Sequence, residues 1–148
     1  MTELFSALWQ TTESQLLRTV DKVDASNVNK RLRPDMRPLG VIFLHIAESQ
    51  FMFVKTLFGA DVPPFTPQTL GKNASAGDIA NADELKAFVK QSCEAIRNGI
   101  AALPASAWDE TVIAPWKAET KRGVLLGFVM GHSMQHVGQV IQALKYGE

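Results

Sequence analysis

Apolar residues recur along the chain at a spacing close to 3.6 residues, the period of an α-helix. The pattern predicts helices over residues 3–23, 36–58, 81–103 and 121–145, and no segment alternates long enough to predict an extensive sheet. We therefore expect an all-α fold, a four-helix bundle in which residues 1–148 form a single domain. The residues expected to line the inner face of the first helix are Phe5, Leu8, Trp9, Thr12, Leu16 and Val20.

Residues at the expected helix ends support these boundaries. Asp35 is suited to cap the second helix, with Pro38 in its first turn, where the missing amide proton does little harm. Gly59 is suited to end this helix in the left-handed conformation. Asn81 opens an Asn-x-x-Glu sequence, which is a capping arrangement for the third helix, and Thr120 is expected to cap the fourth.

The connection over residues 60–82 is rich in proline and small residues, so it is expected to be a long loop. At about 3.3 Å per residue, it could travel back along a full helix. A simple up-down order of helices and an up-down-down-up order with a long crossover are therefore both open. A short extended piece is expected at residues 110–113, before the fourth helix.

Composition narrows the possible partners and locations. The chain has 148 residues, 46% of them hydrophobic, and carries 15 Lys and Arg against 15 Asp and Glu. A net charge of zero argues against binding to nucleic acid or to an anionic membrane surface. Its one cysteine, Cys93, excludes an internal disulfide and a cysteine-rich zinc module. The N-terminal residues lack the features of a signal peptide, so we expect a cytoplasmic protein.

Residues 124–144 lack Asp, Glu, Lys and Arg over a length that could cross a bilayer. The same stretch contains two histidines and three glutamines, which are costly in hydrocarbon. A helix of a soluble bundle explains the stretch better than a membrane span.

The second expected helix is apolar on almost its whole circumference, whereas a surface helix needs a single apolar face. Either it lies at the centre of the bundle or its second face meets another subunit. Gly123, Gly127 and Gly131 recur every four residues on the fourth helix, where each interior glycine costs about 1 kcal/mol relative to alanine. Close packing against another backbone would offset this loss, so the sequence predicts a homodimer that uses these two helices.

The three histidines carry the candidate chemistry. His132 and His136 lie one turn apart on the same face of the fourth helix, and His45 is expected near the middle of the second. Phe128 and other apolar neighbours of the pair are expected to face the core, so all three imidazoles should point inward. Such a set predicts a divalent transition-metal site (zinc, nickel, iron or manganese) with coordination positions left open. The alternative is that each histidine is a core residue hydrogen-bonded to a neighbour.

Four further residues are candidates for the surroundings of this site. Glu48 is the best candidate for a catalytic base, with a partly exposed surface carboxylate as the alternative. Gln135 and Gln139 could orient a ligand or a bound water from a second layer, although a plain surface role is open for both. Trp116, in the connection before the fourth helix, could line a pocket next to this site.

Two segments resemble a known family. The sequences LGVIFLHIAESQFMF around His45 and GHSMQHVGQV around the histidine pair resemble the DinB/YfiT-like superfamily of bundle metalloproteins. The resemblance implies a four-helix bundle, often dimeric, with a metal held by His45, His132 and His136. Gly138 and Gln139 match the Gly-Gln that commonly follows the last ligand. Many members have His-His-Arg where this chain has Gln-His-Val at residues 135–137, so substrate preference is not carried over.

Members of this superfamily whose activity is understood are similar to thiol transferases and isomerases that use mycothiol, bacillithiol or glutathione. The resemblance thus implies a metal-dependent enzyme that transfers a low-molecular-weight thiol to an electrophilic small molecule. A metal-dependent hydrolase with Glu48 as its base is the second hypothesis. A dimer that binds metal or ligand in a stress response, without turnover, is the third.

Overall fold

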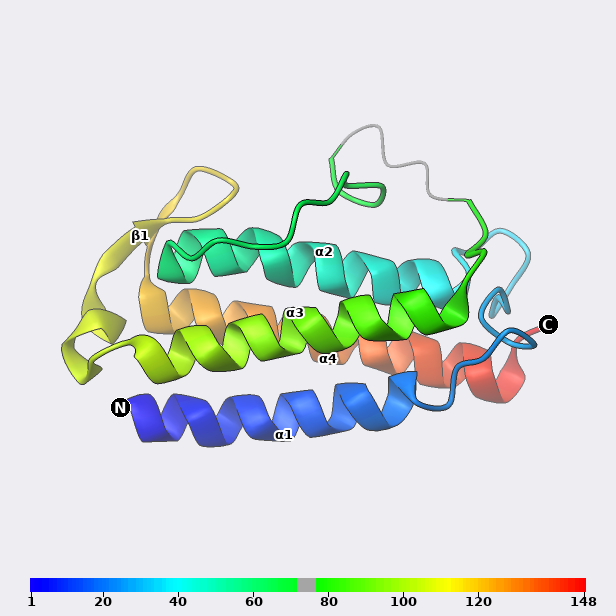
Figure 1. The fold of residues 1–148 in the computed structure, drawn as a ribbon, viewed down its shortest axis with the longest axis horizontal. Coiled ribbons are helices and arrows are strands. Elements are labelled where there is room, and N and C mark those ends of the chain that lie inside the picture. Colours follow the sequence, from blue (N-terminus) through cyan, green and yellow to red (C-terminus); the bar gives the residue numbers. More distant parts are fainter. Residues whose placement is uncertain (72–76) are drawn as a thin grey trace.

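The structure is a computed structural model that describes residues 1–71 and 77–148. Figure 1 shows its four long helices lying side by side: α1 (Thr2–Val20), α2 (Leu39–Phe58), α3 (Ala82–Ala102) and α4 (Arg122–Tyr146). A short 3₁₀ helix, η1 (Ala105–Asp109), and two short strands, β1 (Thr111–Ile113) and β2 (Glu119–Lys121), connect α3 to α4. The predicted four-helix bundle is confirmed.

The helices follow the up-down-down-up order. In Figure 1, α1 and α4 run in one direction and α2 and α3 run in the other. Both α1 and α2 pack against α3 and α4, so α2 and α3 are parallel neighbours. Parallel neighbours need a long return connection, and the green segment after α2 runs back along this helix. Of the loop predicted for residues 60–82, residues 72–76 lie outside the described part of the chain.

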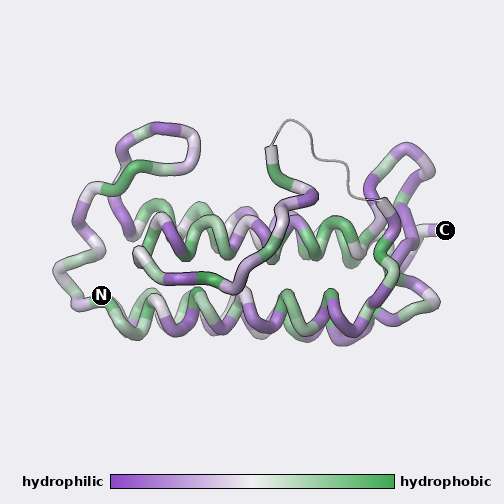
Figure 2. The backbone as a smooth tube through the Cα atoms, turned by 45° about the horizontal axis from the view of Figure 1, so that its top comes forward, coloured by the Kyte–Doolittle hydropathy of each residue, from purple (hydrophilic) through white to green (hydrophobic). Residues whose placement is uncertain are grey.

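The central position of α2 explains its apolar composition. Most of its circumference is buried, whereas α1 and α3 bury a stripe and expose the rest. Figure 2 shows hydrophobic and hydrophilic residues alternating along the helices of the bundle. By length and composition α2 could cross a membrane, but 67% of that stretch is buried inside the bundle. A second subunit is therefore not needed to explain this helix. On α1, Leu8 was expected to face inward but is 47% exposed.

The start of α2 differs from the prediction. Pro38 is the N-cap residue rather than part of the first turn, and its extended backbone ends the preceding loop. Asp35 does not cap the helix but forms an exposed ion pair with Arg33. The reason is steric, because a proline disfavours the helical conformation of the residue before it, and Arg37 would have to be helical if α2 started at Met36. The left-handed cap at Gly59 is confirmed.

Thr120 does not cap α4 as expected but belongs to a β-hairpin that precedes this helix. The predicted extended piece is β1, and it pairs antiparallel with β2, which places Thr120 opposite Val112. Lys121 is the N-cap of α4 and makes no side-chain cap hydrogen bond. The turn uses Lys117 in the left-handed conformation (φ 69°) and has no Asn-Gly or Asp-Gly pair, which is why β2 left no signal in the sequence.

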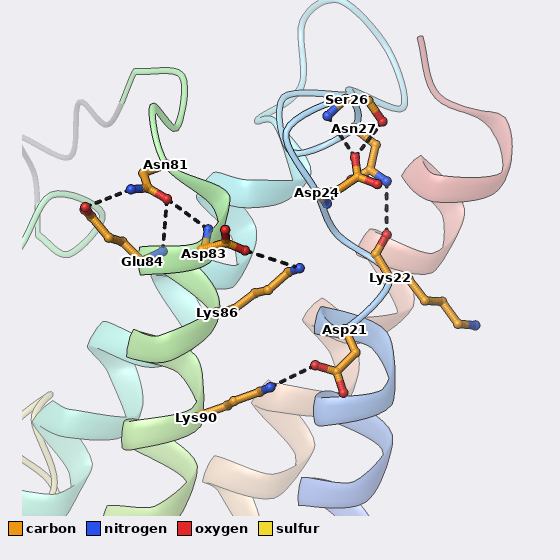
Figure 3. Close-up of polar contacts among 10 residues, drawn as sticks. All are labelled: Asp21, Lys22, Asp24, Ser26, Asn27, Asn81, Asp83, Glu84, Lys86 and Lys90. Carbon is orange, nitrogen blue, oxygen red and sulfur yellow. Dashed lines mark hydrogen bonds and ion pairs between the residues drawn. The ribbon is translucent and has the colours of Figure 1, made fainter.

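The predicted cap of α3 is confirmed. The Asn81 side chain accepts hydrogen bonds from the amides of Asp83 and Glu84 and donates to the Glu84 carboxylate at 2.8 Å (Figure 3). At the same end of the bundle, Asp24 accepts from the backbone amide and hydroxyl of Ser26 in the turn after α1. The Asn81 contacts fix where α3 begins, and the Asp24 contacts hold the turn that follows α1.

Candidate metal centre

The structure brings the three histidines together. One ligand atom from each of His45, His132 and His136 lies within 4.8 Å of the others. His132 occupies the middle position, because its Nε2 is 3.2 Å from the Nε2 of His45 and 3.2 Å from the Nε2 of His136. All three side chains are partly buried.

Two antiparallel helices position these side chains. His132 and His136 are one turn apart on α4, and His45 faces them from α2, which packs against α4. His45 is the seventh residue of α2, so it lies in the second turn rather than near the middle as expected. Phe128 was expected in the core but is 47% exposed, and its ring is stacked on His132 with centroids 6.0 Å apart.

The outer nitrogens of two imidazoles have hydrogen-bond partners. His136 Nδ1 lies 2.7 Å from the Gln139 side-chain oxygen, and His45 Nδ1 lies 3.3 Å from the Thr69 hydroxyl. A carbonyl oxygen can only accept, so this contact places a proton on His136 Nδ1 and leaves Nε2 with a free lone pair. Gln139 thus lies where a second layer was expected.

Glu48 lies beneath the crossover instead of at the surface. Its side chain is buried, with 1% exposure, and both carboxylate oxygens accept hydrogen bonds. The Gln68 amide donates to one oxygen at 2.8 Å, and the Thr69 amide donates to the other at 2.8 Å. The Thr69 hydroxyl makes a further short hydrogen bond to that second oxygen. These bonds favour a role in holding the loop over the proposed role as a base.

Burial favours the neutral form of His45 and His132 by lowering the pKa of each. Desolvation, strengthened by His136 and His45, lowers the pKa of His132 to about 4. The pKa of His45 is also lowered, first by burial and then by the charge of His136. A neutral imidazole is the form that coordinates a metal, so neither group must lose a proton near pH 7 before it can bind one.

The donor set fits a divalent transition metal. With metal–nitrogen bonds of roughly 2.0–2.1 Å, two tetrahedral ligands lie about 3.3 Å apart. The two Nε2–Nε2 separations of 3.2 Å are close to this value. Three protein nitrogens would leave positions free for other ligands, as in catalytic rather than structural zinc sites.

An aromatic group borders the histidines on the exposed side. Trp116, in the hairpin turn, is 52% exposed, and its ring lies 4.9 Å from Phe128 and 6.5 Å from Phe53, measured between centroids. Trp116, Phe128 and His132 therefore form a continuous series from the hairpin to the three histidines. Gln135 lies on the exposed surface of α4.

Sequence reasoning missed two features next to the site. Thr69 contacts His45 from the crossover, a position that no helical period could connect to the histidines. Gln50 is buried and donates to Ser133 at 3.1 Å while it accepts from Ser92 at 2.7 Å, so it links three helices beside His132. The position of Gln50 within the apolar run of α2 could have indicated this link, because a buried amide side chain needs hydrogen-bond partners.

Two hollows lie away from the three histidines. One of about 510 Å³ lies beneath the crossover, between α2 and α3, and one of about 650 Å³ lies between α1 and α3. Glu48 lines the first hollow, and Trp9 lines the second. The three histidines line neither of these hollows.

The sequence identifies the family. The DinB superfamily model matches residues 8–140, and the chain belongs to this superfamily. No curated protein matches the sequence.

Several solved structures share the fold. A DinB-like protein from Bacillus cereus has a TM-score of 0.78 at 12% identity, over 97% of this chain and 90% of that one. YfiT from Bacillus subtilis, described as a probable metal-dependent hydrolase with an unusual four-helix bundle topology, has a TM-score of 0.68 at 14% identity, over 97% and 86%. A mycothiol-dependent maleylpyruvate isomerase has a TM-score of 0.73 at 16% identity. The match covers 95% of this chain and 60% of the isomerase, so this chain spans about three-fifths of that protein.

Proposed function

We propose that His45, His132 and His136 hold one divalent transition-metal ion, zinc, nickel, iron or manganese, and that the protein is an enzyme of the thiol-S-transferase type. The convergence of three imidazole Nε2 atoms, two of them on His45 and His132 whose pKa values burial lowers, is the observation that carries this proposal. When bound, the metal would lower the pKa of a coordinating thiol and so supply a thiolate near pH 7.

The state of Glu48 favours thiol transfer over hydrolysis. A hydrolase of the second hypothesis needs a base to take a proton from water. Glu48 was its candidate, but both of its oxygens are engaged by Gln68 and Thr69 beneath the crossover. A thiol with a lowered pKa needs no such base, because its proton goes to solvent before the reaction. Among the structural neighbours, the isomerase is described as mycothiol-dependent and YfiT as a probable metal-dependent hydrolase, so the choice rests on Glu48.

The aromatic series favours an apolar or planar electrophile as the substrate. Trp116 and Phe128 expose about half of their surface next to His132. Aromatic side chains bind planar groups by offset or edge-on contact. In the proposed reaction the thiol sulfur forms a bond to an electrophilic carbon, and the leaving group departs with its electron pair.

The test uses a chloronitrobenzene as electrophile and glutathione, bacillithiol or mycothiol as thiol. Protein purified without a histidine tag is loaded in turn with each of the four metals, and product formation is followed by absorbance. Activity should require both metal and thiol, be lost in His132→Ala and persist in the exposed control Gln142→Ala. Trp116→Ala should raise KM more than it lowers kcat. Hydrolysis of an activated ester without thiol, and no thiol transfer, would favour the hydrolase instead.

We also propose that the protein is a cytoplasmic homodimer. Reduced low-molecular-weight thiols are maintained in the cytosol, which suits the proposed chemistry. On α4, an added Cβ at Gly127, Gly131 or Gly138 would meet no atom of the described chain within 4 Å, and Met134 and Ile141 beside them are exposed. This face supports contact with a second copy through α4.

A further inference from the structure

The crossover contacts His45 at Thr69. Thr69 is 4% exposed, although it belongs to a loop rather than to a helix. Its hydroxyl lies 3.3 Å from His45 Nδ1 and also bonds to the Glu48 carboxylate. Thr69 thus stands between a buried carboxylate and an imidazole of the candidate metal centre.

Glu48 fixes the position of this threonine. The two backbone amides that donate to Glu48 belong to consecutive residues, Gln68 and Thr69, each at 2.8 Å. Glu48 belongs to α2 and comes three residues after His45 in the same helix. Its hydrogen bonds therefore hold the loop against the helix that carries the His45 imidazole. The Thr69 hydroxyl has little freedom to turn away.

The hydrogen bonds have a definite direction. A hydroxyl has one proton, and Thr69 donates it to the carboxylate, which can only accept. The Thr69 oxygen can therefore only accept from His45, so the imidazole proton must lie on Nδ1. His45 Nε2 is then left with its lone pair directed at His132.

We propose that Thr69 is a positioning residue of the metal centre, which holds His45 in the Nδ1–H tautomer with Glu48 as its support. The inference rests on the proposed function insofar as it takes His45 as a metal ligand. Metal-bound histidines commonly donate their second ring proton to an acceptor that fixes the ring, and loss of the acceptor weakens metal binding. Here a hydroxyl relays this contact to a carboxylate, and the crossover shapes the centre without contributing a ligand.

The variants are chosen to separate the hydroxyl from the volume of the side chain. Thr69→Val keeps the shape and removes the acceptor, whereas Thr69→Ser keeps the acceptor. Thr66→Val is the matched control, because Thr66 is an exposed threonine of the same loop. Zinc affinity of the metal-free proteins is measured by competition with a chromophoric chelator, and helical circular dichroism checks folding.

Thr69→Val should bind zinc roughly 10–100-fold more weakly than the wild type. Thr69→Ser and Thr66→Val should stay close to the wild-type affinity. Folded Thr69→Val with unchanged affinity would overturn the proposal. Equal losses in Thr69→Val and Thr66→Val would also overturn it, because they would show a general effect on the loop.

A second measurement needs no variant and no metal. Nitrogen-15 NMR of the metal-free wild type at pH 7.5 reports which ring nitrogen of His45 carries the proton. The proposal predicts the Nδ1–H tautomer, and a dominant Nε2–H tautomer would overturn it even if Thr69→Val fails to fold. If the wild type binds no metal at all, the proposed function fails. The NMR measurement still tests whether Thr69 holds His45 in the Nδ1–H tautomer.

Discussion

At the scale of single residues, the histidine cluster combines ligand chemistry with partial burial. His132 lies between His45 and His136, and burial together with these two rings lowers its pKa. The metal-free protein therefore holds imidazoles that resist protonation more than they would in the unfolded chain. This links the site to stability.

The pKa of His132 predicts how the stability of the metal-free protein depends on pH. In the unfolded chain this group has the ordinary value of 6.5, and in the folded protein its pKa is about 4. Between these two values the unfolded chain binds more protons, so the free energy of unfolding should fall as pH falls from about 6.5 to 4. Below pH 4 this contribution should level off.

Urea denaturation at pH 7 and pH 5 measures this effect. His132→Gln should lose less stability than the wild type over the same interval, because the titrating group is gone. An equal loss in both proteins, with metal removed by a chelator, would show that His132 is not the responsible group.

The sequence was sufficient to nominate the three histidines, because spacing on helices sets which side chains share a face. Thr69 could not be found in this way, since its contact with His45 depends on the path of a loop of more than twenty residues. Phe128 was assigned to the core because it is apolar, but it lies beside His132 and half exposed. Apolar character alone does not distinguish a core position from the wall of an open site.

At the scale of elements, the ends of the helices depend on local chemistry, and the sequence predicted them unevenly. The Asn81 cap and the Gly59 terminus were correct because side-chain acceptors and left-handed glycine act within a few residues. The predicted start of α2 was wrong by three residues, because Pro38 disfavours the helical conformation at Arg37. The hairpin partner β2 was missed because its turn residues carry no strong signal.

Packing between α2 and α3 leads to a prediction at Gly99. A Cβ at this position would overlap the ring of Phe58, whose nearest atoms are close to its attachment point and cannot swing away easily. Gly99→Ala should therefore destabilise the protein by about 1–3 kcal/mol, although alanine favours helix. Thermal or urea denaturation measures the change.

The double variant Gly99→Ala, Phe58→Leu is the control for this explanation. Removal of the ring should recover part of the loss, because the two positions share one contact. A double variant whose loss is the sum of the two single losses would show that the overlap is not the cause.

At the scale of the whole molecule, the up-down-down-up order makes α2 and α3 parallel and lays the crossover along α2. The sequence allowed this order but could not select it, because a long loop permits both topologies. The order matters for the site, since the returning chain places Gln68 and Thr69 over Glu48. A short hairpin between α2 and α3 would not supply this contact.

The open glycines of α4 test the proposed homodimer. Within the described chain, Gly127→Ala meets open space, so in a monomer it should stabilise the helix by up to about 1 kcal/mol. If α4 forms the interface, the added methyl group should instead weaken self-association. Sedimentation of wild type, Gly127→Ala and the control Gln91→Ala, an exposed position on α3, distinguishes a monomer from a dimer that uses α4. A wild type that is monomeric at micromolar concentration would remove the proposal.

The central claim is that three histidines form one metal centre, and elemental analysis of protein purified without a histidine tag tests it most directly. The account predicts about one divalent transition-metal ion per chain, lost in His45→Ala and in His132→Ala while the helical signal remains. Absence of metal in the wild type, even after reconstitution with zinc, nickel, manganese and iron, would contradict the account. Unchanged metal content in the two variants would contradict it equally.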